Sequence, residues 1–569
     1  MSTYLSAQSL SLAFSSVSLF DSVSFTLNQG DRVGLIGHNG CGKSSLLKLL
    51  SGHIDSFTGQ VSIARQCAVA YVEQQLPDSL QNVTLVEALS ATVKEDEIWR
   101  SELLLSQLGF LPRYWQMPVS YLSGGQHMRL LLGRAIINQP DLLLLDEPSN
   151  HLDLTALLWL ESFLSQWSGS FILVSHDQSL LDKVTNTTWI MRDRRLYHFN
   201  MTCSAARQAL LAQDEAQKQR YDSEQKEIDR LEQSAKRLAN WGKVYDNEDL
   251  ARKAKTMQAR RQRLVENQTQ LGEGVPWRLI FHGESLPADR LVAIEHMNVS
   301  PEASRLSLFQ ILQKQVKSGE RVAIMGDNGC GKSTLLKNLY QFYQHQDEHT
   351  VRYHPQCRMG YYDQSLQQLL DSETLHDALI RFAPVNDDIR KRALIRAGFD
   401  YQRHRQKVGS LSGGERARLL FIGLSLARYH LLMLDEPTNH LDLAGKEELI
   451  ATLSNYPGGV LLVSHDRQLI EACCQRFWLV HHGALTEYMD IEKVYDQLKQ
   501  DEASCGYVSQ ADALTPVGPL QHEEEEDLLA RLVELEQLLK DDLKRKPKHQ
   551  KLARQAQWRL GIEKINRQL

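Results

Sequence analysis

Short apolar runs alternate with apolar-striped helices along most of the chain. Residues 32–36, 142–145 and 171–175 are mostly apolar runs, the pattern of strands buried in a parallel sheet. An apolar helix is expected over residues 45–50, soon after the first of these strands. Strands and helices that alternate in this way predict an α/β fold.

The second half of the chain repeats this pattern. Residues 431–434 and 460–464 match later strands of the first half, and four polar positions recur with them. The pairs, each separated by 289 residues, are Lys43 and Lys332, Ser123 and Ser412, Asp146 and Asp435, and His176 and His465. Because one offset holds for every pair, we infer that a whole domain is duplicated in tandem.

Two segments lie outside the duplication. Residues 204–270 contain 14 Lys and Arg and 11 Asp and Glu, which predicts two solvated helices in a hairpin that turns near residues 240–245. Residues 521–569 have an apolar stripe broken at Pro547, which predicts a short, coiled-coil-like helical pair. The predicted parts are a first domain, a helical linker, a second domain, a flexible segment and a basic tail, over residues 1–200, 201–275, 276–495, 496–520 and 521–569.

Composition narrows the class of protein. With 569 residues, 42% hydrophobic and 24% charged, the chain is typical of a globular protein. Its net charge of −6 predicts no general attraction to nucleic acid, so such contacts need local basic patches. The eight cysteines form no CxxC framework, and no apolar run reaches about 18 residues, so we expect reduced thiols, a cytoplasmic location and no membrane span.

Each duplicated domain has a glycine-rich loop between a strand and a helix. In such a P-loop, backbone N–H groups surround phosphates, a lysine reaches the β and γ oxygens, and a serine binds Mg²⁺. The sequence therefore predicts two nucleotide sites. The loop residues expected to bind the nucleotide are Gly37, Asn39, Gly40, Gly42, Lys43, Ser44 and Ser45, and Gly326, Asn328, Gly329, Gly331, Lys332, Ser333 and Thr334.

Acidic residues end the strand that carries each Walker B motif. Asp146 and Asp435 are placed to hold Mg²⁺, and the next residues, Glu147 and Glu436, to orient or deprotonate a water molecule. A histidine follows a later strand in each half. A lone histidine is more often only packed or solvated, but the positions of His176 and His465 after apolar strands favour a catalytic role.

A second anion site is expected in each half, where a serine and glycines open a helix. The order of these motifs resembles the ATP-binding cassette superfamily. The resemblance implies that two cassettes close head to tail within a monomer, with one ATP between Lys43 and Ser412 and another between Lys332 and Ser123. It also implies nucleotide-binding roles for Ser123, Gly125, Ser412 and Gly414, and nucleotide and metal roles for Gln74 and Gln364. An aromatic residue that stacks on adenine is expected upstream of each P-loop, where Phe14 is a candidate and the second half offers none.

Asn-His-Leu-Asp follows both Walker B motifs, over residues 150–153 and 439–442. With two cassettes, a charged linker and no membrane domain, this resembles the ABC-F family. The resemblance implies an ATPase, many of whose relatives bind the ribosome near the tRNA exit site and act on translation or protect against antibiotics. It also implies that linker 204–270 points at ribosomal RNA or transfer RNA.

The unduplicated segments leave alternatives open. Trp241 and Tyr245 with a basic cluster in the linker fit RNA contact, although charged helices are often only solvated. That cluster comprises Arg252, Lys253, Lys255, Arg260, Arg261 and Arg263. The basic tail equally fits a nucleic-acid contact or packing on a cassette. A transporter's energy-coupling subunit and an ATPase that uses the tail on branched DNA are therefore the competing functions.

Overall fold

The computed structural model describes residues 2–14, 17–74, 76–77, 80–91, 93, 97–150, 152–244, 248–266, 279–287, 290–301, 307–345, 350–481 and 483–504. The chain divides into two compact units, Met1–Glu502 and Ala503–Leu569. The predicted tail, residues 521–569, lies outside the described residues, as does most of the predicted flexible segment. The predicted domain limits stay predictions.

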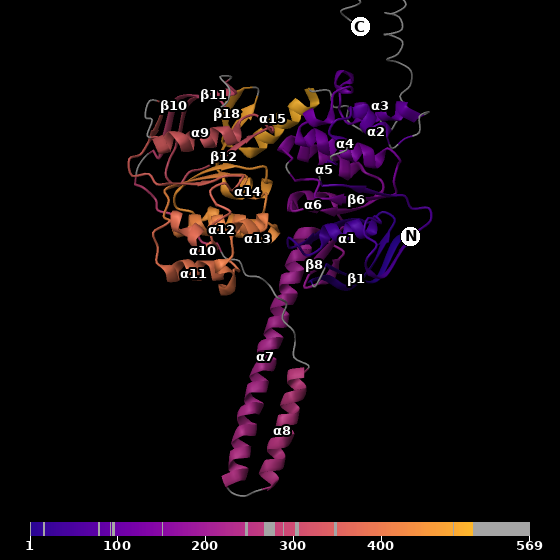
Figure 1. The fold of residues 1–569 in the computed structure, drawn as a ribbon, viewed down its shortest axis with the longest axis vertical. Helices are drawn as coiled ribbons and strands as arrows, with labels where there is room; N and C mark the ends of the chain where they lie inside the picture. Colours follow the sequence, from indigo (N-terminus) through magenta and orange to yellow (C-terminus); the bar gives the residue numbers. More distant parts are fainter. Residues whose placement is uncertain are drawn as a thin grey trace, which may run out of the picture. The chain divides into compact units, whose positions relative to one another are not determined.

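The first cassette combines a mainly parallel sheet with a small antiparallel one (Figure 1). Its larger sheet has the order β5-β6-β7-β3-β8-β9 and the smaller one β2-β1-β4. The strands are β1 (Thr3–Phe14), β2 (Val17–Asn28), β3 (Arg32–Gly37), β4 (Thr58–Ile63), β5 (Val69–Val72), β6 (Leu142–Asp146), β7 (Ser170–Val174), β8 (Thr187–Arg192) and β9 (Arg195–Phe199). The helices are α1 (Lys43–Leu50), α2 (Leu85–Ser90), α3 (Ile98–Gln107), α4 (Gly124–Ile136), α5 (Leu154–Gln166) and α6 (Gln178–Val184).

The second cassette repeats these elements within one nine-stranded sheet, ordered β13-β10-β11-β18-β17-β12-β16-β15-β14. Its strands are β10 (Val292–Val299), β11 (Phe309–Val316), β12 (Arg321–Gly326), β13 (Val351–Tyr353), β14 (Met359–Tyr362), β15 (Leu431–Asp435), β16 (Gly459–Val463), β17 (Arg476–His481) and β18 (Ala484–Tyr488). Its helices are α9 (Lys332–His345), α10 (Leu375–Ala378), α11 (Asp387–Arg396), α12 (Gly413–Leu426), α13 (Leu443–Ser454), α14 (Arg467–Cys473) and α15 (Ile491–Ser504). The expected tandem α/β cassettes are thus confirmed.

Strand register gathers the motif residues at one edge of each sheet. In the first cassette, β3 and β6 both pair in parallel with β7, and all five residues of β6 and of β7 are buried. Because parallel strands end at the same edge, the P-loop after β3 meets the acidic end of β6. The same pairings, β12 and β15 with β16, build the second site.

The linker contains two long helices that lie side by side, α7 (Cys203–Val244) and α8 (Glu248–Glu266) (Figure 1). The predicted turn over residues 240–245 starts later than expected, because α7 continues through Trp241 to Val244. A single glycine in a helix, such as Gly242, costs only about 1 kcal/mol of helix stability relative to alanine. The packing of α7 on α8 offsets this cost.

No membrane-spanning helix is found among the described residues: none of their helices has both the length and the apolar character needed.

Candidate functional site

Both P-loops fold between a buried strand and a helix. Lys43 lies at the start of α1, and its Nζ donates to the carbonyl oxygens of Gly37 at 2.9 Å and His38 at 3.0 Å. Gly40 has a φ of +82° with open space where a Cβ atom would stand, so its backbone leaves room for a bound anion. Lys332 makes the equivalent contacts with the carbonyl oxygens of Gly326 and Asp327, both at 2.8 Å.

A serine and an aspartate meet at each predicted metal position. Ser44 Oγ donates to Asp146 Oδ1 at 2.9 Å, and Ser333 Oγ donates to Asp435 Oδ1 at the same distance. Tyr71 donates its hydroxyl to the other oxygen of Asp146 at 3.1 Å, whereas Asp435 Oδ2 is buried without a hydrogen-bond partner in the described part of the chain. Burial raises the pKa of Asp435 to about 6, against the hydrogen bond from Ser333. Asp435 therefore presents a vacant oxygen ligand.

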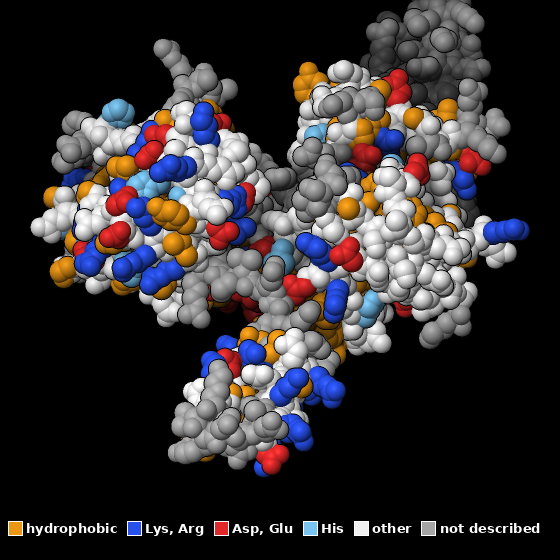
Figure 2. Space-filling model, turned by 60° about the horizontal axis from the view of Figure 1, so that its bottom comes forward, with side chains coloured by type: hydrophobic (Ala, Val, Ile, Leu, Met, Phe, Trp, Pro, Cys, Tyr) orange, Lys and Arg blue, Asp and Glu red, His pale blue; other side chains and the backbone are white. Residues whose placement is uncertain are grey.

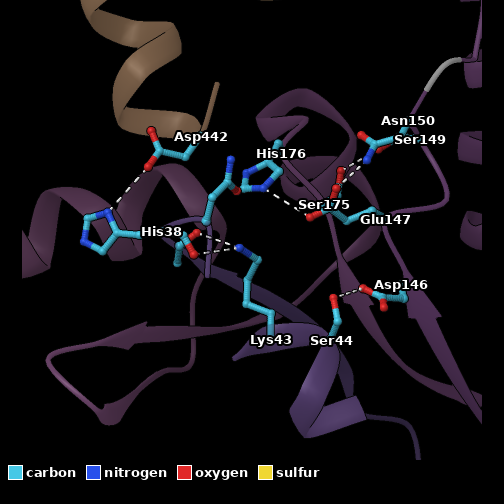
Figure 3. A network of polar contacts seen from close by, with 12 residues as sticks. His38, Lys43, Ser44, Asp146, Glu147, Ser149, Asn150, Ser175, His176 and Asp442 are labelled. Carbon is cyan, nitrogen blue, oxygen red and sulfur yellow. Dashed lines mark hydrogen bonds and ion pairs between the residues drawn. The ribbon is translucent and has the colours of Figure 1, made fainter. Parts of the chain in front are cut away.

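The first predicted general base is held by polar neighbours (Figure 3). His176 Nε2 lies 3.2 Å from Glu147 Oε1, although the two are not aligned as a hydrogen bond, and Asn150 donates to Oε2. Burial alone would raise the pKa of Glu147, but His176, the charge of Lys43 and the Asn150 amide together lower it to about 2. This carboxylate is therefore ionised and positioned.

The second predicted general base lies in a different environment. Glu436 Oε1 is buried and has no hydrogen-bond partner among the described residues, and His465 Nε2 lies 3.6 Å away. Burial raises the pKa of Glu436 to about 8, against the opposing charge of Lys332. Burial and the same lysine hold the pKa of His465 well below its usual value. The two sites thus share residue types and differ in electrostatics.

Each P-loop contacts the segment after Walker B of the other cassette. His38 Nδ1 lies 3.5 Å from Asp442 Oδ2 (Figure 3), and Asn39 donates to the carbonyl oxygen of His440 at 3.5 Å. The signature of each cassette is the helix start with a serine and two glycines, at Ser123 and at Ser412. A Cβ atom on Gly414 of the second signature would stand 3.7 Å from Asn39 Nδ2. The first P-loop therefore faces the second signature across the interface, as the family resemblance implies.

The other P-loop makes matching contacts with different partners. Thr155 Oγ1 donates to Asp327 Oδ1 at 3.1 Å, and the backbone N–H of Asn328 donates to Asp153 Oδ2 at 3.1 Å. At one interface His38 of the P-loop faces Asp442, whereas at the other interface Asp327 of the P-loop faces Thr155. A cavity of about 400 Å³ lies there, lined by Lys332, Ser333, Thr334, Gln364, Glu436 and His465 and by His176 and Asn150 of the first cassette.

Both signature serines begin a helix through a capping box. Ser123 Oγ accepts from the N–H of Gln126, whose side chain accepts from the Ser123 N–H at 3.0 Å. Ser412 pairs with Glu415 in the same way, and its hydroxyl also donates to Glu415 Oε2 at 3.1 Å. These helix starts leave backbone N–H groups for an anion, which is the arrangement a terminal phosphate needs.

These residues fit ATP with Mg²⁺. The open space at Gly40 and Gly329 leaves room for phosphates, and the oxygen donors at Ser333 and Asp435 suit a hard cation. Gln364 lines the cavity, and Gln74 lies two positions after β5, where Gln364 lies relative to β14. The predicted adenine-stacking positions, the side chain of Phe14 and residues 302–306, lie outside the described residues. His151 of the Asn-His-Leu-Asp segment also lies outside them.

Several residues at the sites lie outside the motifs found in the sequence. Tyr71 reaches Asp146 because β5 pairs with β6 in register, and Lys446 crosses the interface to the carbonyl oxygen of His176. The repeat offers a signal only for Tyr71, which it aligns approximately with Tyr361, because it aligns Lys446 with Leu157.

Known proteins resemble the chain over most of its length. A family profile described as "ABC transporter" matches residues 20–150 and 309–439. The chain is 33% identical to the probable ATP-binding protein YheS of Escherichia coli (strain K12), over 85% of this chain and 81% of that protein. It is 30% identical to ABC transporter F family member 2 of Dictyostelium discoideum, over 86% of this chain and 88% of that protein.

Solved structures share the fold. The archaeal ribosome recycling factor aABCE1, solved in complex with the ribosomal stalk protein aP1, superposes with a TM-score of 0.57 at 17% identity, over 84% of this chain and 90% of that one. At this identity the likeness concerns the fold alone. Tandem cassettes with reciprocal P-loop contacts, together with these relatives, lead to one conclusion: the chain belongs to the ABC-F family of ATP-binding cassette proteins.

Proposed function

We propose that the protein binds two ATP molecules with Mg²⁺ between its cassettes, hydrolyses them, and uses the cycle to act on the ribosome during translation. The observation that carries the ribosomal part is the exposed basic end of the linker hairpin. Proteins that share the fold include an archaeal ribosome recycling factor and ABCE1 bound to the ribosome with archaeal Pelota. This proposed activity includes protection of the ribosome against antibiotics.

The chemistry follows from the residues at each site. Bound Mg²⁺ would neutralise phosphate charge, held by Ser44 and Asp146 in the first site and by Ser333 and Asp435 in the second. Lys43 would exchange its carbonyl partners for phosphate oxygens. Glu147, ionised by its neighbours, would orient the attacking water and accept its proton. Bringing the signature serine onto the terminal phosphate would couple ATP binding to cassette closure.

Lys and Arg side chains gather on the exposed surface of the linker hairpin (Figure 2). Arg260 and Arg261 lie against acidic residues of α7, with ion pairs to Glu227 at 3.1 Å and Glu232 at 3.2 Å. Arg252, Lys253 and Lys255, nearer the end where α7 and α8 meet, are exposed and make no ion pair with any residue that the structure describes. Trp241 is 55% exposed near the same end. These groups fit phosphates and an unstacked base.

Trapping the closed state tests this function. Replacing Glu147→Gln and Glu436→Gln together should block hydrolysis while both sites still bind ATP. We expect the double variant to sediment with ribosomes when ATP is present, and the wild type to be released as it turns ATP over. A double variant that sediments free of ribosomes would contradict the proposal. Retention on branched DNA or a membrane fraction instead would favour the competing functions.

A matched pair of linker variants tests the contact itself. The change Arg252→Gln, Lys253→Gln and Lys255→Gln should lower the slope of log K against log salt by about 2 to 3 for three lost phosphate contacts. The control Arg260→Gln with Arg261→Gln should lower it less, because those cations already face Glu227 and Glu232. Equal effects of both variants would argue against this part of the hairpin as the contact.

A further inference from the structure

One lysine lies between the two switch loops, the segments that carry His176–Asp177 and His465–Asp466. Lys446, in α13, donates from Nζ to the backbone oxygen of His176 at 2.9 Å across the cassette interface. The same Nζ lies 2.7 Å from Asp466 Oδ2 in its own cassette. Its side chain is only 12% exposed. A single ammonium group therefore touches the switch loops of both sites.

The duplication provides no second copy of this lysine. The residue 289 positions earlier is Leu157, which is buried. Leu157 and Lys446 both line the cavity of about 400 Å³ at the second P-loop. The neighbouring interface pair is also unmatched: Arg467 donates to Glu161 at 2.6 Å, while the repeat offset places Gln178 and Ile450 at those positions. Among the described residues, this lysine contact between the switch loops has no repeat-related copy, and the second cassette supplies it.

Contacts of the first switch loop explain why the carbonyl contact matters. Neither ring nitrogen of His176 makes an aligned hydrogen bond in the described part of the chain. The backbone position therefore sets how the ring meets Glu147, whose carboxylate lies 3.2 Å from Nε2. Lys446 fixes that backbone from the opposite cassette. Removing the ammonium would take the ion-pair partner from Asp466 and leave Arg467 as the main positive charge near the buried Asp177.

We propose that Lys446 is a positioning residue that links the two switch loops, so that turnover at each ATP site depends on this one group. The inference rests on the proposed ATP hydrolysis. It predicts that replacing Lys446 acts on the rate of the bound enzyme more than on nucleotide affinity, since Lys446 contacts switch loops rather than a P-loop.

The test compares Lys446→Met with Lys183→Met. The control removes an ammonium that pairs with Glu161 at 2.8 Å in the same region. We expect Lys446→Met to lower kcat about tenfold with KM for ATP changed less than about twofold, and Lys183→Met to change neither. Each single-site variant, Glu147→Gln or Glu436→Gln, should be slowed again by Lys446→Met, because the lysine serves the remaining site in both.

Hydrogen exchange gives a readout that needs no turnover. Without nucleotide, the amides at the start of α6, next to His176, should exchange faster in Lys446→Met and at the wild-type rate in Lys183→Met. Should Lys446→Met fail to fold, Lys446→Gln provides the same comparison with a neutral donor. Unchanged exchange, unchanged kcat, or slowing of only one single-site variant would each overturn the link. A wild type without ATPase activity would instead defeat the proposed function, while the exchange experiment would still test the contact.

Discussion

Both predicted general bases have a left-handed backbone conformation, which residues other than glycine rarely adopt. The φ angles of Glu147 and Glu436 are 49° and 47°, directly after the strands that carry Walker B. Such a residue costs of order 1–3 kcal/mol and persists only where its surroundings hold it. At Glu147 the surroundings include Asn150 and His176, whereas one carboxylate oxygen of Glu436 has no hydrogen-bond partner among the described residues. The strain is therefore compensated unequally.

Replacing each glutamate with glycine tests this difference. Glu436→Gly should raise the free energy of unfolding by about 1 kcal/mol, because it relieves the backbone strain and removes a poorly satisfied buried carboxyl group. Glu147→Gly should raise it less or lower it, because contacts with Asn150 and His176 are lost. Urea unfolding without nucleotide measures both. A Glu436→Gly variant no more stable than the wild type would show that its strain is already relieved.

Acid should weaken the contact at Asp442. Burial would raise the pKa of Asp442, but His38 and the N–H of Gly445 outweigh it and lower the pKa to about 2. A lowered folded pKa means that the stabilisation is full above the ordinary value near 4 and is lost as the pH falls toward 2. Asp442→Asn, which keeps a helix cap, should flatten the pH dependence of stability in that window by up to about one proton. Identical slopes for both proteins would contradict this.

Helix α13 connects parts that are distant in the sequence. Its N-cap, Asp442, faces the first P-loop, and one turn later Lys446 and Glu447 reach the switch loops and the linker. Arg207 near the start of α7 forms a two-pronged ion pair with Glu447, and its guanidinium also donates to Gln178 Oε1 at 3.2 Å. Movement of the second cassette relative to the first would therefore shift Arg207 and the start of α7, where the linker hairpin begins.

A charge exchange tests this connection. Arg207→Glu and Glu447→Arg should each destabilise the protein, and the double variant should recover about 0.5–1 kcal/mol of coupling energy, since Glu447 is 53% exposed and the pair is partly screened. A double-mutant cycle on urea unfolding measures it. The pair Arg352 and Glu295, exposed at 67% and 58%, serves as a surface comparison with a smaller coupling energy. Equal coupling in the two pairs would remove Arg207 from this role.

Local sequence signals predicted most elements well because they rest on local physics. Buried strands such as β6 and β7 need apolar runs, and the capping boxes at Ser123 and Ser412 mark their helix starts. The linker was harder to predict. Its helical period continues through Gly242, so the turn was placed too early, and the basic cluster did not reveal that Arg260 and Arg261 face acids of α7.

At the scale of the whole molecule, the repeat predicted two nucleotide sites with the same motif residues, and the structure shows that the electrostatics of these residues differ between the sites. Motif residues were readable because phosphate and metal chemistry dictates their type and spacing. The contacts of Lys446 and of Asp442 were not, because they depend on how one cassette meets the other, which no local pattern encodes. Differences between aligned positions, such as Lys446 and Leu157, were visible in the sequence but had no meaning without that interface.

Ligand removal should be visible as a loss of stability. ATP and Mg²⁺ at about 100 times Kd should stabilise each site by about 2.7 kcal/mol, so the Tm of the Glu147→Gln and Glu436→Gln variant should rise with Mg-ATP and fall again on addition of EDTA. Scanning fluorimetry follows both changes. Adding Lys43→Ala and Lys332→Ala should abolish the rise. A rise that survives these changes would place ATP elsewhere.

The two capping boxes differ in charge, because one contains Glu415 and the other contains Gln126. This difference predicts the order in which the two sites would release phosphate. Ser412 shares its hydroxyl with the carboxylate of Glu415, whereas Ser123 faces the neutral amide of Gln126. If ATP is hydrolysed as proposed, the free phosphate beside Ser412 would stand near the negative charge of Glu415, which is paired with Arg403 at 2.7 Å. We therefore expect the phosphate held between Lys43 and Ser412 to leave before the phosphate held between Lys332 and Ser123, so that the cassettes separate at one ATP site first.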